Sequence, residues 1–168
     1  MEIICASDLN LYRDELADLL IEAVADGASI GFIAPVTLSE ATSYWQQISA
    51  QLTESTQWMW LALDAGKLLG TVQLSVCNKA NGSHRAEVEK LMVAKAARGK
   101  GVAKALMKAL EAWACEHQLG LLVLDTKQGD VASFLYPKLG YQSGGVIPDF
   151  AKDGLGRMAA TVYFYKQL

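Results

Sequence analysis

A short stretch of this chain combines the residue types that bind a phosphorylated ligand. It reads Val-Ala-Lys-Ala-Ala-Arg-Gly-Lys-Gly-Val-Ala over residues 93–103, between an apolar strand pattern and a long amphipathic helix pattern. Glycines let a backbone approach a ligand closely, and a helix N-terminus offers free N–H groups and the positive end of its dipole. From Lys90 to Lys108 the chain has six basic residues and no acidic one. The stretch therefore predicts a site for the pyrophosphate of a cofactor.

The spacing of the glycines narrows the choice of cofactor. A Walker loop requires G-x-x-x-x-G-K-[ST], but Gly101 stands where the Ser or Thr is needed. A dinucleotide-binding fingerprint requires a third glycine where this chain has Lys104. The run Arg98-x-x-Gly101-x-Ala103 instead resembles [QR]-x-x-G-x-[GA], the pyrophosphate loop of the GNAT acyltransferases, which bind acetyl-CoA. The alternative is an ordinary strand-to-helix turn with a solvated basic face.

Turn residues and hydrophobic periods predict the elements that must position this loop. Four helices are expected, from Ser7 or Asp8 to about Val24, from the capping box Thr37–Glu40 to about Ser55, from Gly101 to about His117, and from Asp130 to Leu139. Strands are expected at Glu2–Cys5, Trp58–Leu63, Lys67–Val76, Ala86–Val93, Leu121–Asp125, Tyr141–Ile147 and Met158–Lys166.

The resulting order, β-α-α-β-β-β-α-β-α-β-β, begins with an antiparallel meander and alternates strands with helices only later. It predicts an α/β (α+β) fold in which helices flank a single mixed, mostly antiparallel sheet. The same order is that of the GNAT fold. The chain has no internal repeat or linker, so residues 1–168 are expected to form one domain.

Two further motifs extend the resemblance to the GNAT family. Leu91-Met92-Val93 resembles the strand that pairs with the pantetheine arm, and residues 132–141 resemble the helix motif A-x-x-x-Y-x-K-x-G-F. Segments 27–32, 85–93, 120–126 and 161–166 look more narrowly like the tabtoxin-resistance acetyltransferases, which acetylate the amine of a small amino-acid-like toxin. The resemblance implies acetyl-CoA as cosubstrate and, as the residues that bind it, Leu91, Met92, Val93, Arg98, Gly99, Lys100, Gly101, Val102, Ala103, Ala132 and Tyr136.

Acetyl transfer to an amine requires a neutral amine, a hydrogen-bond donor for the oxyanion and a proton for the leaving thiolate. The candidate bases are Asp125, at the end of an apolar strand, and then Glu87 and Glu89, on one face of a neighbouring strand. Substrate binding by these carboxylates, with water relaying the proton, is equally compatible. The resemblance implies that the N–H of Val93 is the oxyanion donor and that Tyr136 protonates the thiolate.

The charge is distributed unevenly along the chain. Residues 1–84 hold ten acids and three bases, a net charge of −7, and residues 85–168 hold eight acids and twelve bases, a net charge of +4. The basic half suits an anionic cofactor, and the acidic half is compatible with a cationic substrate. The total of −3 lacks the basic footprint of a nucleic-acid-binding protein.

The remaining composition argues against export, membrane insertion and metal binding. No apolar run approaches the ~20 residues of a membrane span. Cys5, Cys77 and Cys115 form no C-x-x-C pair and are expected to be reduced thiols in a cytoplasmic protein. His84 and His117 have no metal-ligand spacing, so no metal is expected.

These observations predict an N-acetyltransferase that moves the acetyl group of acetyl-CoA to the primary amine of a small amino-acid-like acceptor, with toxins and antibiotics among the candidates. One alternative is an acyl-CoA-binding regulatory module without catalysis, and another is a GNAT enzyme that acts on a peptide N-terminus. The presence of Glu87, Asp125 and Tyr136 favours an enzyme. Whether the chain is a monomer or a homodimer is left open.

Overall fold

The computed structural model describes residues 1–53 and 56–168, and seven of its strands form one sheet. The strands are β1 (Glu2–Cys5), β2 (Gln57–Asp64), β3 (Lys67–Val76), β4 (Arg85–Val93), β5 (Leu121–Lys127), β6 (Gln142–Lys152) and β7 (Met158–Gln167). The helices are α1 (Arg13–Ala25), α2 (Leu38–Thr53), α3 (Val102–Glu116) and α4 (Val131–Lys138). Three 3₁₀ turns lie at Asn10–Tyr12, Ala80–Gly82 and Lys95–Ala97.

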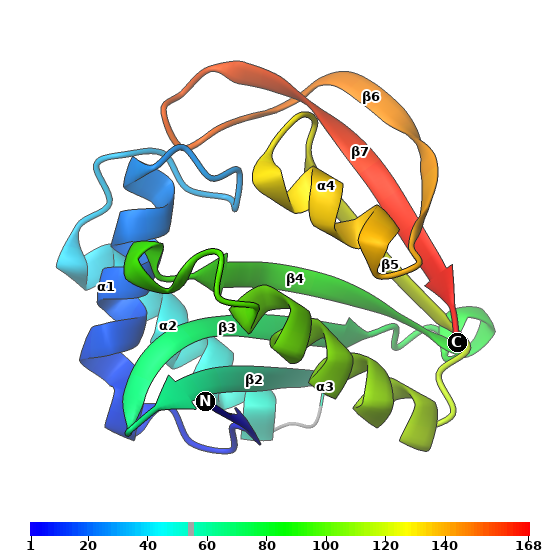
Figure 1. Cartoon of the computed structure of the whole chain (residues 1–168), viewed down its shortest axis with the longest axis horizontal. Coiled ribbons are helices and arrows are strands. Elements are labelled where there is room, and N and C mark those ends of the chain that lie inside the picture. The colour runs from blue at the N-terminus through cyan, green and yellow to red at the C-terminus, as the bar shows by residue number, and fades with distance from the viewer. Residues whose placement is uncertain (54–55) are drawn as a thin grey trace.

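The sheet order is β1-β2-β3-β4-β5-β7-β6, and every neighbouring pair is antiparallel except β4 with β5. Helices α3 and α4 cover one face, and α1 and α2 lie behind the sheet (Figure 1). The mixed, mostly antiparallel sheet with flanking helices confirms the predicted fold class. Short connections without a long helix join β2 to β3 and β3 to β4, which pair antiparallel, whereas the crossover through α3 joins the parallel pair β4 and β5.

Each face of the sheet has its own apolar core. On the α3 side, Val88 of β4 and Leu122 of β5 pack with Leu106 and Leu110 of α3. The other core joins α1, α2 and the opposite face of β2 and β3, around the buried Trp45. Alternate residues of each strand therefore serve different cores, as the period of two requires. This alternation decides which strand residues remain for the functional face.

Local signals in the sequence explain several element boundaries. The capping box is present, because Glu40 accepts hydrogen bonds from the backbone N–H and hydroxyl of Thr37, and the hydroxyl of Thr37 accepts one from the N–H of Glu40. The hairpin between β2 and β3 turns at Ala65 and Gly66, both with positive φ. The predicted end of α2 at Ser55 lies outside the described residues, and its last described residue is Thr53.

Two helix boundaries differ from the sequence prediction. Asp8 accepts a hydrogen bond from the N–H of Asn10, the first residue of the 3₁₀ turn, and the α-helix begins later, at Arg13. Helix α4 ends at Lys138 rather than Leu139, and Pro137 lies in its last turn. A proline has no N–H to extend the ladder, which is consistent with the early end.

An irregularity in β4 changes which side chains reach each face. The register passes from Gln73 opposite Glu89 to Thr71 opposite Met92, so β4 has one extra residue there. Lys90 lies at this β-bulge with a φ of 50°. After the bulge, Met92 belongs to the α1–α2 core, on the same side as Glu87 and Glu89. The bulge thus reverses the alternation in the last third of β4.

Candidate active site

Strands β4 and β5 separate to form the opening that defines the candidate site. They pair in parallel over only three positions, from Arg85 opposite Leu121 to Glu87 opposite Val123. Beyond that point β5 continues to pair with β7, and β4 continues to pair with β3. The two strands diverge visibly in Figure 1, with α3 below the opening and α4 above it. Among the strands of residues 1–53 and 56–168, none pairs with the outer edge of β4 from Val88 onward.

The free edge of β4 ends in an amide that points into the opening. The N–H of Ala94 donates to the carbonyl of Leu69 across β3, at 2.9 Å. Because amides alternate between the two edges of a strand, the N–H of Val93 points to the other edge, toward β5. The carbonyl of Val93 lies there too, where it accepts a hydrogen bond from the Nε of Arg98 at 3.2 Å. This is the orientation expected of the predicted oxyanion donor.

The glycine loop after β4 has the backbone that its sequence predicts. Gly99 and Gly101 have φ values of 75° and 82°, a left-handed region that glycine adopts at little cost. A Cβ at either position would meet no atom within 4 Å, so the space beside both residues is open. Gly101 is the N-cap of α3, and no side chain caps the helix there. The first N–H groups of α3 are thus available to an anion.

The cations of the loop divide into two groups. All four are exposed, but they differ in their partners. Lys95 and Arg98 form ion pairs with Asp26, next to the C-terminus of α1, at 3.2 and 2.8 Å, whereas Lys100 and Lys104 form none with the described residues. Hydrogen bonds from Arg98 and Lys95 lower the pKa of Asp26. Arg98, predicted as a cofactor residue, thus also ties the loop to α1. This pairing could not be predicted from the sequence, because Asp26 lies 72 residues away from Arg98.

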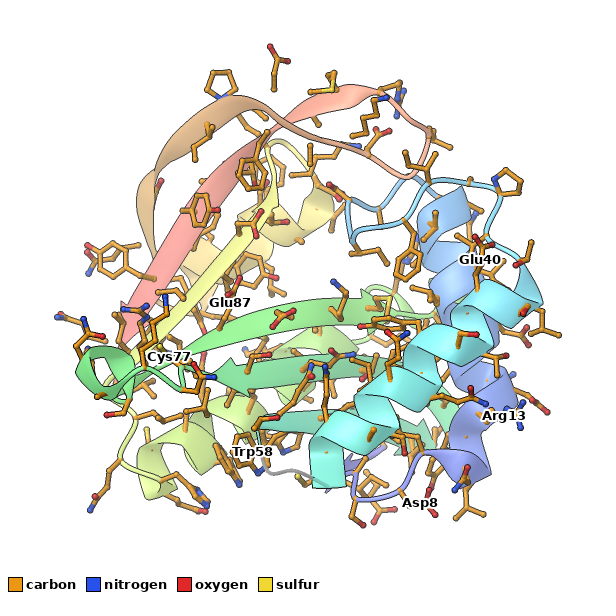
Figure 2. The ribbon with its side chains drawn as sticks, turned by 180° about the vertical axis from the view of Figure 1, so that it is seen from behind. Asp8, Arg13, Glu40, Trp58, Cys77 and Glu87 are labelled. Carbon is orange, nitrogen blue, oxygen red and sulfur yellow. The ribbon has the colours of Figure 1, made fainter. Side chains whose placement is uncertain are left out.

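The candidate bases lie on one face of the sheet. Glu87 is opposite Val123 in the register, and Asp125 follows two residues later, so both side chains point to the side away from α3 and α4. Partial burial, followed by the nearby carboxylates of Glu89 and Asp125, raises the pKa of Glu87. Figure 2 shows Glu87 where α1 and α2 no longer cover the sheet. The structure thus brings Glu87, Glu89 and Asp125 together beside the opening.

Each of the other two carboxylates has a hydroxyl partner. Asp125 accepts a hydrogen bond from the Oγ of Thr161 on β7 at 2.6 Å, and Glu89 accepts one from the Oγ of Ser75 on β3 at 2.5 Å. A hydroxyl donor fixes the orientation of a carboxylate and leaves its second oxygen available. Neither hydroxyl was identified from the sequence, since the pairing of β5 with β7 and of β3 with β4 had to be known first.

Tyr136 lies on the opposite side of the sheet from these carboxylates. Its ring is 5% exposed and packs with Tyr141 and Phe164. Burial, followed by the charges of Asp125 and Asp130, raises the pKa of Tyr136. Like an ordinary tyrosine, this residue is protonated at neutral pH, a state in which it can donate a proton. Its burial is equally that of a core aromatic residue, so the predicted role stays a prediction.

The other predicted cofactor residues contribute mainly backbone. Met92 and Val102 are 3% and 2% exposed and belong to the two cores, so their side chains face away from solvent. Leu91, Ala103 and Ala132 are half-buried. This pattern fits a site in which main-chain groups bind the cofactor, while apolar side chains packed in the two cores hold the main chain in place.

A buried ionic cluster on the other side of the opening was not predicted. Asp153, 2% exposed, accepts hydrogen bonds from Lys127 at 2.9 Å and from the guanidinium of Arg157. These partners, Lys127 first, hold the pKa of Asp153 far below its usual range. Lys127 also donates to the carbonyl of Gly27, and the N–H of Ala34 donates to the carbonyl of Gly154. The cluster therefore fixes the β6–β7 loop against residues 27–34.

Comparisons with known proteins agree with this geometry. Residues 28–141 match the sequence model of the acetyltransferase (GNAT) family. A ribosomal-protein-alanine N-acetyltransferase from Brucella melitensis superposes with a TM-score of 0.80 at 21% identity, with all of both chains covered. A GNAT phosphinothricin acetyltransferase from Sinorhizobium meliloti, in complex with acetyl-CoA, gives 0.80 at 20% identity over 99% of this chain and 88% of that one. A GCN5-related N-acetyltransferase from Kribbella flavida gives 0.78 at 24% identity, over 99% and 97%.

The family match covers more than half of the chain, so the protein belongs to the acetyltransferase (GNAT) family. Membership indicates an acetyl-CoA-dependent N-acetyltransferase. Within residues 1–53 and 56–168, no group of three or more His, Cys, Asp and Glu side chains is arranged to hold a metal ion. In the same part of the chain, none of the helices has the length and apolar character needed to cross a membrane.

Proposed function

We propose that this protein transfers the acetyl group of acetyl-CoA to the primary amine of a small amino-acid-like acceptor, and that residues 1–168 act as one domain. The observation that carries the proposal is the separation of β4 and β5 after Glu87. It leaves a free amide edge of β4 that leads to the glycine loop, with Glu87 and Glu89 on β4 and Asp125 across the opening on β5. The narrower resemblance to tabtoxin-resistance acetyltransferases supports an amino-acid-like acceptor, a toxin or antibiotic among them.

The residues of the chain can be given separate roles in this reaction. When bound, acetyl-CoA supplies the acetyl group as a thioester. The N–H groups at the start of α3 bind its pyrophosphate, and the N–H of Val93 donates to the oxygen that gains negative charge. Asp125, with Glu87 beside it, removes a proton from the ammonium group, directly or through water. Tyr136 donates a proton to the departing sulfur.

The overall change balances without a further reactant. The ammonium group loses two protons, a C–N bond forms and the C–S bond of the thioester breaks. The sulfur keeps the electron pair of that bond and takes one proton, and the other proton is released. A metal or redox cofactor has no part in these steps.

A peptide N-terminus is the second candidate acceptor, because one structural neighbour is described as a ribosomal-protein-alanine N-acetyltransferase. We favour a small molecule, since the β6–β7 loop is fixed against residues 27–34 beside the acceptor face.

Cys5, Cys77 and Cys115 are unpaired, as in a protein of the cytoplasm. The chain could act as a monomer or as a homodimer.

The test is thiol release from acetyl-CoA in the presence of a panel of small amines, amino acids and short peptides. We expect acceptor-dependent release, with mass spectrometry showing one added acetyl group on the acceptor. Tight acetyl-CoA binding without release for any acceptor would instead favour the non-catalytic module. Release with peptides alone would favour the peptide N-terminus.

A further inference from the structure

We propose that a polar pocket beneath α2 is a second subsite for the acceptor and binds a second cationic group, so that the acceptor is a diamine or a dibasic amino acid. This inference rests on the proposed function. The pocket is a hollow of about 340 Å³ beside the bulge of β4. The residues of its wall that carry the argument are Tyr44, Gln57, Gln73, Ser75, Glu89 and Lys90.

Two buried amides form the inner wall of the pocket. Gln73 is fully buried and Gln57 is 7% exposed. The Nε2 of Gln57 donates to the Oε1 of Gln73 at 2.6 Å, and the Nε2 of Gln73 donates to the hydroxyl of Tyr44 at 3.1 Å. Burying an amide is unfavourable unless it is hydrogen-bonded, and apolar side chains would fill such a site more simply. The network holds polar groups in fixed positions directly behind the more exposed wall residues Tyr44, Ser75 and Glu89.

Glu89 gives this pocket its charge. The hydroxyl of Ser75 holds one carboxylate oxygen, and among the described residues no cation lies within ion-pair distance of the other. The neighbouring Lys90 sits on the bulge, and its Nζ lies beside Gly31, 4.0 Å from where a Cβ on that residue would be. A half-buried carboxylate without a counter-ion is costly. A cationic ligand would supply the missing charge.

The pocket lies close enough to the candidate bases for one small molecule to reach both. In the sheet register Ser75 is opposite both Glu87 and Gln57, so the pocket extends from β4 across β3 to β2, about 10 Å. Glu89 lies two residues along β4 from Glu87, about 7 Å. An amine at Asp125 and Glu87 could therefore be joined to a cation at Glu89 by a few methylene groups.

The charges that face this region agree with a doubly cationic acceptor. Three carboxylates, those of Glu87, Glu89 and Asp125, face it together with one ammonium group, that of Lys90. Tyr44 and Tyr163 also face it, but a phenol is neutral at physiological pH and adds no charge to this region. The excess of two negative charges matches two cationic groups. Lys90 can bind the carboxylate of the acceptor when a dibasic amino acid is bound.

The experiment compares matched acceptors in thiol-release assays. 1,4-Diaminobutane is paired with butylamine, and lysine is paired with norleucine. We expect kcat/KM for the dicationic member of at least one pair to exceed that of its partner by about 10- to 100-fold, the usual value of a charge-assisted hydrogen bond. Preference in the first pair indicates a diamine, and preference in the second pair alone indicates a dibasic amino acid.

Variants assign the preference to the pocket. Glu89→Gln should reduce the ratio within the preferred pair to near one, and Ser75→Ala should reduce it by a smaller factor, because the carboxylate remains but is no longer held. Glu116→Gln is the matched control, an exposed residue at the far end of α3, and it should leave the ratio unchanged. Equal use of both members of each pair, or a ratio that survives Glu89→Gln, would overturn the subsite. Absence of thiol release with every amine would overturn the proposed function itself.

Discussion

The glycine loop and the carboxylate face both lie along β4, but they are built from different parts of the chain. The loop is continuous in sequence, and the groups that we propose to bind the cofactor are backbone amides whose direction follows from Gly99, Gly101 and the start of α3. The carboxylate face combines β3, β4, β5 and β7, and its side chains are oriented by hydroxyls from neighbouring strands. The glycine loop is therefore a local structure, whereas the carboxylate face forms only when the sheet is folded.

This difference predicts different consequences of mutation. Substitutions in the loop should weaken the binding of acetyl-CoA whichever amine is the acceptor, because in our proposal the same backbone amides bind the cofactor in every reaction. Substitutions on the carboxylate face should change the reaction of the amine and leave cofactor affinity nearly intact. The following predictions test this separation, from the largest expected effect to the smallest.

Gly101→Asp should weaken acetyl-CoA binding by about 100-fold or more, measured by calorimetry. The change adds a negative charge where the phosphates would lie, and like charges ~4 Å apart near a protein surface repel by about 4 kcal/mol. Gly66→Asp is a matched control, because Gly66 has a φ of 81° and equally open surroundings in the distant β2–β3 turn. Unchanged affinity in folded Gly101→Asp would remove the loop from the cofactor site.

Asp125→Asn should lower kcat/KM for the amine by about 10²- to 10⁴-fold, with little change in acetyl-CoA affinity. Asparagine can still accept the hydrogen bond of Thr161 but cannot take up a proton. Asp64→Asn, an exposed position at the end of β2, provides the same chemical change outside β4 and β5. If Asp125→Asn kept full activity from pH 6 to 9, the base would have to be sought elsewhere.

Tyr136→Phe should lower kcat by about 10- to 100-fold, the low end for general acid catalysis, because water can partly replace the phenol. The loss should shrink when the leaving thiol is made more acidic. Tyr141→Phe is the control, since it deletes the hydroxyl of a second buried tyrosine whose ring packs against that of Tyr136. Equal slowing with good and poor leaving groups would mean that Tyr136 only positions the cofactor.

The smallest effect is expected for Glu87→Gln. This variant should gain a little stability while it loses activity. The pKa of Glu87 is raised in the folded protein by burial and by Glu89 and Asp125, so its charged form costs folding free energy at neutral pH. The variant should be more stable at pH 7, by less than about 1 kcal/mol because the side chain is partly exposed. The gain should vanish as the pH falls below the ordinary pKa of a glutamate, about 4.3, where both states are neutral.

Urea unfolding of both proteins between pH 3.5 and 7.5 measures this difference directly. In the same series kcat/KM for the amine should fall in Glu87→Gln at every pH where the wild-type carboxylate is charged. A variant that lost stability at pH 7 would show that Glu87 is held by a favourable interaction and is not held among like charges.

The elements with local signals could be predicted from the sequence alone. The capping box at Thr37 and Glu40, the turn at Gly66 and the N-cap at Asp130 are all present in the structure. Each depends on residues within a few positions of one another, so their hydrogen bonds are set by spacing. The order of the apolar strand and helix patterns likewise sufficed for the fold class, although β6 extends to Lys152 and not, as predicted, to Ile147.

Long-range contacts were out of reach of the sequence. The extra residue in β4 at Lys90 depends on its pairing with β3, and the ion pair of Arg98 with Asp26 joins segments far apart in the chain. The cluster around Asp153 and the amide network of Gln57 and Gln73 are similar cases. The sequence around a glutamine in a strand does not show whether its side chain is exposed or buried.

By itself the sequence therefore determined the loop between β4 and α3, the order of the elements and the residue types available for acetyl transfer. Tertiary structure decided where β4 and β5 part, which carboxylates meet beside the opening and which polar side chains line the pocket under α2. The physical reason is the range of the interactions. Helix caps and glycine turns are fixed by neighbours in the chain, whereas a binding face of side chains requires strands that only the closed sheet brings together.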